Sequence, residues 1–393
     1  MAGKYIKIID KERCCACNAC REVCPNSCIE MKPDGMGLLY PEVDTSSCID
    51  CGLCVRTCPF INTLEPSPVN NCYAALNKDD NWRLASSSGG VFIELARLTI
   101  SSGGVVFGVK FAKDWQVVHS CAETMDGVLP MMGSKYVQSD TRDTYQEAKS
   151  FLDAGRDVLY TGTPCQIAGL KHYLRKDYPK LLTVELICHG APAPGVWRAY
   201  LDEVLARNQN ETEADITGIN FRSKQKGWKD FGFEIQKNGS HTFEPAMKNQ
   251  YMKAFLQNWT LRPSCYSCKS KCGTSGADMT IGDFWGIDKM GDVEDDDKGV
   301  SCIICRTAKG QDTIDKLKLI TFSPVDYSTI LQGNPSLENS VTFSFSARRF
   351  QKKFPKLGFS KTMSIIESPS LLYRAAGFIK RRLSRAVKIF YRA

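Results

Sequence analysis

Residues 14–25 read CCACNACREVCP, and residues 48–59 read CIDCGLCVRTCP. Each stretch holds four cysteines with the spacing C-x2-C-x2-C-x3-C and a proline directly after the last one. This spacing binds pairs of cubane 4Fe-4S clusters, because three close cysteines hold one cluster while the fourth reaches the other. The first cluster is therefore expected on Cys14, Cys17, Cys20 and Cys58, and the second on Cys48, Cys51, Cys54 and Cys24.

Zinc is the alternative metal for these cysteines, because C-x2-C pairs also bind zinc. Structural zinc sites close with four ligands from separated pairs, whereas here a run of four cysteines occurs twice, which favours the clusters. Cys15 and Cys28 lie off the repeated spacing and are interpreted as packed thiols. The region resembles the dicluster ferredoxin family over about residues 5–62.

The composition is that of a globular protein with two or three domains. The chain has 393 residues, of which 43% are hydrophobic and 24% charged, so neither a disordered chain nor a multi-span membrane protein fits. No secretory signal opens the sequence, and no apolar run approaches the length of a membrane span. The protein is therefore expected in the cytoplasm, where its nineteen cysteines favour metal or redox roles over disulfides.

The positive charge is concentrated at the C-terminal end. Residues 1–65 and 66–347 each carry a net charge of −2, whereas the basic tail at 348–393 carries +12, so a nucleic-acid partner is not expected. Residues 371–393 place apolar positions at helical spacing opposite basic ones, which is typical of a helix on an anionic membrane surface. That interpretation puts the protein peripherally at the inner membrane face, and the alternative is a helix packed on the body or on a partner.

The middle of the chain alternates strand-like and helix-like segments, which predicts a mixed α/β sheet domain. A linker with two prolines at 64–71 precedes it. Strands are predicted at 105–111, 115–123, 158–162 and 181–190, and helices at 141–155, 164–176 and 194–208. Cys302 and Cys305 lie in an apolar strand in which their side chains face opposite sides, so both are interpreted as core thiols.

Three turns beside these elements carry residues suited to chemistry. The SSSGG stretch at 86–90 precedes a helix, so its backbone amides either bind a phosphate or serve only as a serine N-cap. Thr163 is expected to cap the next helix, and Cys165 lies in its first turn, where the helix dipole favours a thiolate. His189, in the CHG turn after an apolar strand, is either a base or a structural histidine.

A second set of cysteines is spread over three segments. Cys265, Cys268 and Cys272 cluster in one loop that lacks a fourth ligand. Cys188 would lie at the same edge of the sheet as Cys165 if the strands before them are neighbours. Cys165, Cys188, Cys265 and Cys268 would together complete a third cubane cluster.

The middle of the chain also carries six motifs in a fixed order. They are SSSGGVF (86–92), GSKYVQS (133–139), VLYTGTPCQIAGL (158–170), ICHG (187–190), FRSKQKGW (221–228) and ADMTIGDFWG (277–286). Together they resemble the family of β subunits of coenzyme F420 hydrogenases and dehydrogenases over roughly residues 72–330. The resemblance implies an FAD, a 4Fe-4S cluster, and electron transfer between iron–sulfur centres and a small organic acceptor.

The resemblance also implies where the cofactors bind. A flavin site is implied near Ser87, Gly89, Gly90, Lys135 and Thr163. Lys135 is a candidate for stabilising negative charge, with a solvated surface lysine as the alternative, and His189 is a candidate for proton transfer. The implied ligands of the third cluster are again Cys165, Cys188, Cys265 and Cys268, while Cys272 leaves open a set that omits Cys165 or Cys188.

We therefore expect a small dicluster ferredoxin domain, then a mixed-sheet α/β domain for flavin and cluster, and a basic C-terminal helix. The expected bounds are 1–65 for the ferredoxin domain, 72–150 and 151–335 for the two parts of the β-subunit-like domain, and 348–393 for the tail. The expected function is that of an iron–sulfur flavoprotein oxidoreductase with a redox protein and a small organic substrate as partners. The alternative is an electron-transfer subunit that docks on a separate catalytic partner and has no substrate of its own.

Overall fold

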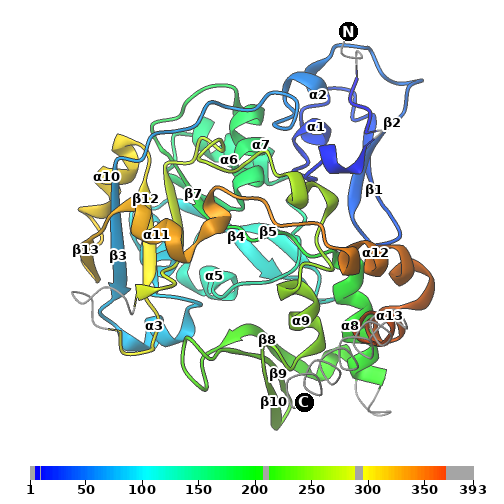
Figure 1. Ribbon diagram of the computed structural model, residues 1–393. Helices are drawn as coiled ribbons and strands as arrows, with labels where there is room; N and C mark the ends of the chain where they lie inside the picture. Colours follow the sequence, from blue (N-terminus) through cyan, green and yellow to red (C-terminus); the bar gives the residue numbers. More distant parts are fainter. Residues whose placement is uncertain (1–4, 9, 207–211, 288–294, 369–393) are drawn as a thin grey trace, which may run out of the picture.

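The largest element of the fold is an eight-stranded mixed sheet (Figure 1). The computed structural model describes residues 5–8, 10–206, 212–287 and 295–368. The strands follow the order β13-β3-β12-β11-β7-β6-β4-β5. Their bounds are β3 Asn71–Asn77, β4 Val105–Phe111, β5 Val117–Ala122, β6 Val158–Gly162, β7 Leu181–Leu186, β11 Met279–Asp283, β12 Ser301–Cys305 and β13 Ile320–Pro324.

The centre of this sheet is parallel. The pairs β4/β6, β6/β7 and β7/β11 are parallel, and the remaining pairs are antiparallel. β6, β7 and β11 therefore end at one edge of the sheet, at Gly162, Leu186 and Asp283. Ligand sites of open α/β sheets form beside this carboxyl edge, because the loops that follow the strands meet there.

Helices cover both faces of the large sheet. α4 (Val91–Ser101) packs on one face, in a buried cluster that includes Val106. α6 (Thr144–Asp153) and α7 (Pro164–Leu174) pack on the other face, in a buried cluster that includes Phe107. Neighbouring residues of β4 thus point to opposite sides, as strand geometry requires, and the sheet has a hydrophobic layer on each face.

A smaller antiparallel sheet and several helices share an aromatic core. The rings of Trp197, Phe221, Phe233 and Tyr251 are buried there and contact one another. Figure 1 shows β8, β9 and β10 in this unit, next to α8 and α9. The bounds are β8 Ile216–Ser223, β9 Gly232–Lys237, β10 Ser240–Pro245, α8 Pro194–Ala206, α9 Gln250–Leu256, α12 Phe345–Leu357 and α13 Phe359–Glu367.

The N-terminal module is a short hairpin with two one-turn helices. Its elements are η1 Lys11–Arg13, α1 Ala19–Glu22, β1 Ile29–Pro33, β2 Leu39–Val43 and α2 Leu53–Arg56. Each four-cysteine run contains one of the helices, and each helix starts after a residue in the left-handed conformation, Asn18 with φ 62° or Gly52 with φ 70°. The two runs therefore fold alike, as their repeated spacing predicts.

The remaining described helices are short and connect these units. They are α3 Asp80–Ala85, α5 Met125–Val128, α10 Ala308–Ile314, α11 Tyr327–Gly333 and the 3₁₀ turns η2 Leu129–Met131, η3 Glu213–Asp215, η4 Pro263–Ser267 and η6 Pro335–Leu337. In the described ranges, no helix combines the length and the apolar character that a membrane crossing needs.

The elements predicted for the middle of the chain are confirmed with shifted ends. The strands predicted at 105–111 and 115–123 are β4 and β5, which pair antiparallel, and the helix predicted at 164–176 is α7. β7 ends at Leu186, so the CHG turn lies beyond the strand. The two thiols of β12, Cys302 and Cys305, are fully buried in two different hydrophobic clusters, which confirms them as core residues.

The start of the basic tail packs on the body of the protein. α12 buries Ala347, Phe350 and Phe354, and α13 follows it with Phe359 against the ring of Tyr200. The amphipathic helix expected at 371–393 lies outside the described residues. The membrane interpretation of that helix stays a prediction.

Candidate functional site

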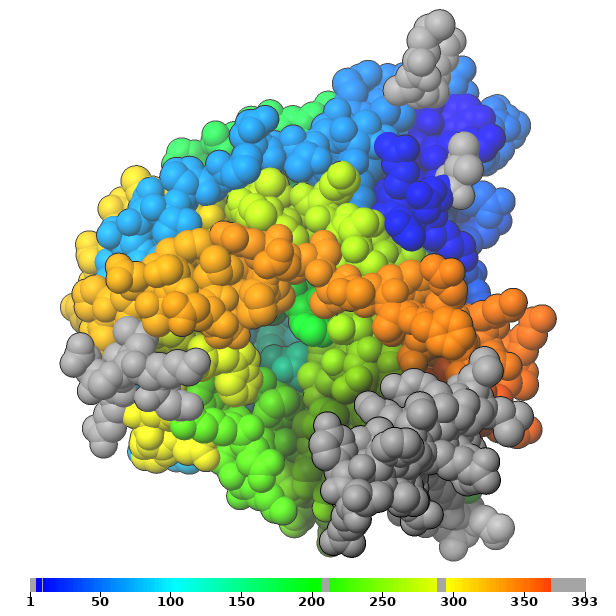
Figure 2. Space-filling model, in the orientation of Figure 1, coloured from blue at the N-terminus to red at the C-terminus, as the bar shows by residue number. Residues whose placement is uncertain are grey.

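A cavity of about 590 Å³ opens at the carboxyl edge of the parallel strands. Its lining includes Thr163, Cys188 and Asp283, which stand at or just after the ends of β6, β7 and β11. Figure 2, which has the orientation of Figure 1, shows a hollow in the face toward the viewer. Segments coloured orange, yellow and green border this hollow. Pockets of this size are typical of cofactor and small-molecule sites.

Four cysteines from three segments lie along this cavity. Cys165 is in the first turn of α7, Cys188 follows β7, Cys265 is in η4, and Cys268 follows η4. Burial raises the pKa of Cys188 to about 12, with Cys165 and Cys268 adding to the rise and a nearby lysine opposing it. Burial also raises the pKa of Cys265 and of Cys268. Burial alone would keep these four neighbouring thiols protonated. They fit a metal centre, because thiols lose their protons when they bind a metal.

One expectation for Cys165 is wrong. The first turn of a helix was expected to favour the thiolate, yet the contact with Cys15 and burial raise the pKa of Cys165 well above its usual value. Thr163 opposes this shift, because its hydroxyl lies 3.3 Å from the sulfur. The neighbouring thiol and burial therefore favour the protonated form of Cys165.

Cys272 lies apart from the four cavity thiols. Its side chain is exposed, and its sulfur donates to the carbonyl of Glu338 at 3.6 Å. Cys272 does not line the cavity, whereas Cys165 and Cys188 do. The geometry therefore favours the predicted set of four over a set in which Cys272 replaces one member.

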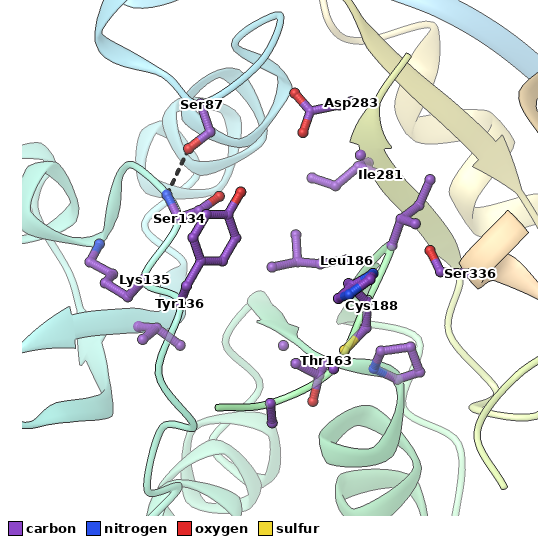
Figure 3. Close-up of a pocket in the computed structure, with 18 of the residues that line it drawn as sticks. Ser87, Ser134, Lys135, Tyr136, Thr163, Leu186, Cys188, Ile281, Asp283 and Ser336 are labelled. Atoms are coloured by element: carbon purple, nitrogen blue, oxygen red, sulfur yellow. Dashed lines mark hydrogen bonds between the residues drawn. The ribbon is translucent and has the colours of Figure 1, made fainter. Parts of the chain in front are cut away.

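The residues predicted for a flavin site line the same cavity, with one exception. Ser87, Gly90, Lys135 and Thr163 line the cavity. Figure 3 places Ser87 across the cavity from Cys188 and shows the Ser87 hydroxyl accepting a 2.7 Å hydrogen bond from the amide of Ser134. The SSSGG turn and the loop that carries Lys135 are thus joined directly.

Gly89 is the exception, because it faces the sheet. Its amide donates to the hydroxyl of Ser301 at 2.9 Å, and an added Cβ would lie 2.3 Å from the carbonyl oxygen of Ala75. Gly90 is the N-cap residue of α4. Its φ of +83° is a left-handed conformation, which favours glycine. The turn thus needs Gly89 for close packing on β3 and β12, and Gly90 for its direction into the helix.

Thr163 caps the start of α7, as predicted, and forms a capping box with Gln166. Both its amide and its hydroxyl donate to the side-chain oxygen of Gln166 at 2.9 Å, and Pro164 occupies the first turn. Gln166 in turn donates to the hydroxyl of Ser139 at 3.0 Å. This network fixes the loop between β6 and α7 on which Cys165 stands.

Lys135 and His189 both line the cavity with their polar atoms engaged by the protein. The Lys135 ammonium donates to three backbone carbonyls of its own loop, at 2.7 to 3.2 Å, and burial lowers its pKa to about 7. His189 Nε2 lies 2.5 Å from the side-chain oxygen of Asn258, and burial lowers the pKa of the ring. The roles predicted for the two residues, in charge stabilisation and proton transfer, stay predictions.

A buried ion pair at the end of β11 was missed by the sequence analysis. Arg222 donates to both carboxylate oxygens of Asp283, at 2.9 and 3.1 Å, and to the carbonyl of Ser87 at 3.2 Å. Its guanidinium lies over the rings of Phe231 and Trp285. The motif FRSKQKGW contains Arg222, but the partner 61 residues away could not be read from the pattern.

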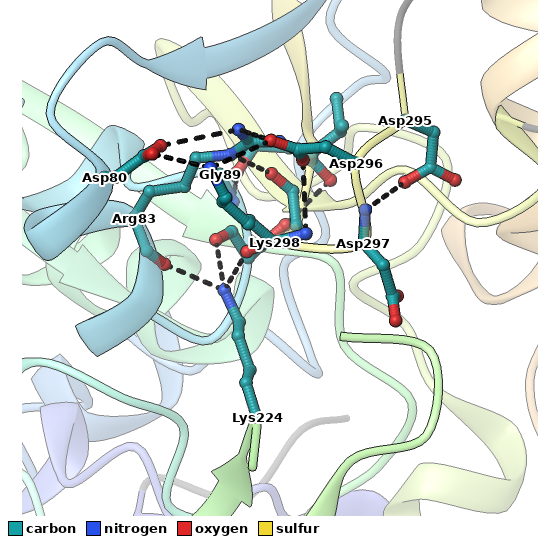
Figure 4. Close-up of polar contacts among 12 residues, drawn as sticks. Asp80, Arg83, Gly89, Lys224, Asp295, Asp296, Asp297 and Lys298 are labelled. Carbon is teal, nitrogen blue, oxygen red and sulfur yellow. Dashed lines mark hydrogen bonds and ion pairs between the residues drawn. The ribbon is translucent and has the colours of Figure 1, made fainter. Parts of the chain in front are cut away.

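Lys224 forms hydrogen bonds with the SSSGG turn and with two neighbouring segments (Figure 4). Its ammonium donates to the carbonyls of Arg83, Ser88 and Lys298, at 2.8, 2.8 and 2.6 Å. Arg83 also pairs with Asp296 through both ends of its guanidinium. Three segments are thereby tied together, which positions the start of α4 at the cavity.

Cysteines of both runs lie close together in the N-terminal module. Cys58, from the second run, is among the thiols that act on Cys20, together with Cys14. Cys24, from the first run, acts on Cys54. Cys54 also acts on Cys20, so the exchange of Cys24 and Cys58 between two cubane clusters stays a prediction. Burial raises the pKa of Cys20, Cys54 and Cys58.

A cubane cluster and a single metal ion need different thiol spacings. In the part of the chain that the structure describes, no three His, Cys, Asp or Glu side chains surround one point closely enough for a single ion. A cubane is larger, because it holds four iron atoms with one ligand each. The chemistry of the donor sets, with four cysteines in each, fits that group.

The N-terminal module is docked on the body beside the cavity. Arg262, only 1% exposed, donates to the carbonyl of Cys14 at 2.5 Å and to that of Leu39 at 2.8 Å. Gln138 donates to the carbonyl of Cys15 at 2.8 Å. Arg262 and Gln138 both line the cavity, so the first cysteine run is held against its wall.

Two protein-family models match this chain. A 4Fe-4S dicluster domain matches residues 13–62, and the model for the C-terminal part of the β subunit of coenzyme F420 hydrogenase/dehydrogenase matches residues 155–326. The first match contains both four-cysteine runs. The second contains all four cavity cysteines and Arg222.

Several curated proteins are similar to the chain over part of their length. The F subunit of the F(420)H(2) dehydrogenase of Methanosarcina mazei is 24% identical over 242 residues, which make up 58% of this chain and 67% of that protein. The coenzyme F420-dependent sulfite reductase of Methanocaldococcus jannaschii is 23% identical over 333 residues, 80% of this chain and 48% of that protein. An uncharacterized ferredoxin of the same organism is 50% identical over 70 residues, 18% of this chain and 38% of that protein. The chain thus spans between 38% and 67% of the lengths of these relatives.

Among solved structures, a chain of the F420-reducing NiFe hydrogenase complex from Methanosarcina barkeri is similar, with a TM-score of 0.47 and 17% identity. The similarity covers 73% of this chain and 94% of that chain.

Proposed function

Because this chain belongs to the family of coenzyme F420 hydrogenase/dehydrogenase β subunits and carries a 4Fe-4S dicluster domain, we propose that it is an iron–sulfur flavoprotein oxidoreductase. It passes electrons between three 4Fe-4S clusters and a small organic acceptor. One observation carries the proposal: Cys165, Cys188, Cys265 and Cys268 line the same cavity as the SSSGG turn and several basic residues. A cluster and an acceptor can therefore lie side by side.

Three clusters are proposed, each on four cysteines. The first two occupy the N-terminal module, with the fourth cysteine of each run exchanged between them; the effects of Cys58 on Cys20 and of Cys24 on Cys54 support this exchange. The third uses Cys165, Cys188, Cys265 and Cys268. The amide of Ala191 supports this site, since it donates to the sulfur of Cys265 at 3.3 Å, a contact typical of iron–sulfur centres.

FAD is the proposed occupant of the cavity beside the third cluster. When bound, it would link one-electron chemistry to two-electron chemistry, because a flavin exchanges electrons singly or in pairs. Ser87, Gly90 and Thr163 line the region where it would bind, and the start of α4 offers unpaired backbone amides to a phosphate. Lys135 and His189 lie in the same lining and keep the roles expected from the sequence as proposals.

The acceptor is proposed as a small organic molecule that enters the same cavity. The names of two relatives contain coenzyme F420, which makes a deazaflavin one candidate. The cavity lining includes Lys135, Arg222, Arg262 and Lys271 but Asp283 as its one acidic residue among those described, so an anionic ligand suits it better than a cationic one.

The test is anaerobic purification of the full chain, followed by assays of iron, acid-labile sulfide and released flavin. About twelve iron atoms and one FAD per chain support the proposal, because each cubane holds four iron atoms. About eight iron atoms without flavin would overturn it and leave a dicluster ferredoxin joined to a domain of another role.

A second candidate is an electron-transfer subunit without a substrate of its own. It is favoured by the name of the Methanosarcina mazei relative, which is one subunit of a dehydrogenase. Steady-state reduction of deazaflavin or flavin analogues by the purified chain distinguishes the two. Activity that needs a second protein, isolated with the chain from its native host, would favour the second candidate.

A further inference from the structure

One side of α12 packs on the body of the protein, and the other side carries positive charge. Ala347, Phe350 and Phe354 are buried on the inner side. The helix contains five basic residues and no acidic one. The basic residues, here called the basic face of α12, are Arg348, Arg349, Lys352, Lys353 and Lys356. Three of them, at 348, 352 and 356, are exposed and lie along one line of the helix, because residues four apart are neighbours on a helix surface.

The charges of this face are not neutralised by carboxylates of the described chain. Among the described residues, none of the five forms an ion pair, whereas the nearby Lys253 pairs with Glu367 of α13 at 2.7 Å. The guanidinium groups of Arg348 and Arg349 instead lie over the rings of Phe343 and Phe345. A group of like charges without internal partners favours an anionic surface as its ligand.

Apolar side chains are exposed at both ends of the basic face. Phe345 starts α12 and is 74% exposed, and Leu357 ends it and is 37% exposed. Sites that bind a membrane surface combine basic residues with Phe or Leu, because the apolar side chain enters the headgroup region while the charges meet the lipid phosphates. An acidic protein surface would use the charges alone, so these two side chains favour a lipid surface.

The chain that follows α12 adds charge of the same sign. Figure 1 shows α13 next to α12, and the rings of Phe350 and Phe359 join the two helices with 6.5 Å between their centres. Residues 371–393, which follow shortly after α13, contain seven Lys or Arg and no acidic residue. The membrane contact predicted for that segment and the basic face of α12 would thus serve the same kind of surface.

We propose that the basic face of α12 is a docking surface for a membrane that contains anionic lipids. The five basic side chains bind lipid phosphates, and Phe345 and Leu357 enter the headgroup region beside them. A group of about four to eight Lys or Arg on one helix is typical of such sites, and each charge near the surface adds affinity. The inference does not rest on the proposed function, because it needs neither a cluster nor a flavin.

α12 also contacts the N-terminal module. A Cβ on Gly35, in the turn between β1 and β2, would lie 3.0 Å from the Cβ of Pro355. Docking through α12 would therefore hold the N-terminal module close to the membrane, within reach of redox partners bound to the same surface.

The experiment measures co-sedimentation of the full chain with vesicles, either of phosphatidylcholine alone or of equal parts of phosphatidylcholine and phosphatidylglycerol. The wild type should bind the anionic vesicles and not the neutral ones, and added salt should weaken binding because it screens the charges. The triple variant Arg348→Gln/Lys352→Gln/Lys356→Gln should bind the anionic vesicles at least about tenfold more weakly. Phe345→Ser, which leaves the charge unchanged, should also weaken binding.

Two further triple variants with the same loss of charge serve as controls. Lys113→Gln/Lys316→Gln/Lys318→Gln removes three exposed lysines of other segments and should bind like the wild type. Arg381→Gln/Arg385→Gln/Lys388→Gln removes three charges of the segment 371–393, so it measures what that segment contributes by itself. Thermal unfolding of all variants checks that the substitutions of exposed side chains leave the fold intact.

Three results would overturn the inference. Equal binding of the anionic vesicles by the α12 triple variant and the Lys113→Gln/Lys316→Gln/Lys318→Gln control would mean that the basic face of α12 does not contact the membrane. Equal binding of the wild type to both kinds of vesicle would exclude recognition of anionic headgroups. Absence of binding to either vesicle would exclude a membrane, and retention of the same protein on immobilised polyglutamate would then identify an acidic protein surface as the ligand.

Discussion

Lys271 donates a hydrogen bond from its ammonium to the backbone carbonyl of Cys188, at 2.7 Å. The same ammonium donates to the carbonyl of Ser336, which also lines the cavity. Lys271 therefore links the segment of Cys188 to the segment of Ser336. Its charge lowers the pKa of Cys188 against the effect of burial, and it does the same to Cys268. A positive charge is therefore built in beside the thiols proposed for the third cluster.

Lys271→Met should lower the midpoint potential of the third cluster. The reduced cluster carries more negative charge than the oxidised one, so loss of a neighbouring cation disfavours reduction. Redox titration followed by electron paramagnetic resonance measures the shift. Lys269→Met is the control, because Lys269 is exposed and does not line the cavity. Equal potentials in Lys271→Met and Lys269→Met would contradict a role for the charge.

Cys188→Ser should reduce the iron content from about twelve to about eight atoms per chain, because it removes one of four proposed ligands of a cubane. Cys272→Ser should retain all the iron, since Cys272 is exposed and its sulfur donates to the backbone carbonyl of Glu338. Iron and sulfide assays on the two anaerobically purified variants give the answer. Loss of iron from Cys272→Ser with retention in Cys188→Ser would reverse the ligand assignment.

The two four-cysteine runs carry most of what the sequence predicts about the site. Their spacing is local, so it indicated the two clusters and the exchange of Cys24 and Cys58 without knowledge of the fold. The strands that end at the carboxyl edge could also be predicted from short stretches of sequence. β6, for example, is a short apolar run directly before the cap residue Thr163. Cys165 and Cys188 could be placed together only on the condition that the strands before them are neighbours, and the pairing of β6 with β7 meets that condition.

Contacts between distant segments could not be predicted in this way. Gly89 was placed at the flavin site from its motif, yet it faces the backbone of β3, because only the folded sheet brings Ala75 beside it. The docking of the first cysteine run on the cavity wall depends on Arg262 and Gln138, which donate to the carbonyls of Cys14 and Cys15. Nothing in the sequence around Arg262, which precedes a cysteine loop, indicates that this arginine is buried in the fold.

Lys224→Met should loosen the SSSGG turn and weaken flavin binding. The substitution leaves the carbonyls of Arg83, Ser88 and Lys298 without this donor, and a buried unpaired acceptor costs about 1–3 kcal/mol. We expect a lower free energy of unfolding and faster loss of FAD on gel filtration. Urea unfolding and the flavin-to-protein absorbance ratio measure the two effects.

Lys226→Met is the matched control for this prediction. Lys226 lies in the same loop, two residues further on, but it is exposed, and its described contact is with the ring of Phe243. It should keep flavin and stability near the wild type. Equal flavin retention in Lys224→Met and Lys226→Met would mean that the hydrogen bonds from Lys224 to the SSSGG turn and its neighbours do not contribute to flavin binding.

His119 is a buried histidine that connects β5 to the network around Thr163. Its Nε2 donates to the carbonyl of Thr161 at 3.2 Å, since a carbonyl can only accept, and the hydroxyl of Ser139 donates to Nδ1 at 3.0 Å. Ser139 also accepts from Gln166, which caps α7 together with Thr163. The ring is 2% exposed, and burial lowers its pKa to about 4.

Acid should therefore destabilise the protein through His119. The pKa is lower in the folded chain than the usual value of about 6.5, so the unfolded chain binds more protons between these values, and stability falls as the pH falls from 6.5 toward 4. The loss between pH 7.5 and 5.5 is about 1.4 kcal/mol from this group. Urea unfolding at the two pH values should show that His119→Asn loses correspondingly less stability than the wild type. His241→Asn, which removes an exposed histidine, should keep the wild-type dependence. If His119→Asn and the wild type lose the same stability over this range, protonation of His119 does not contribute to acid unfolding.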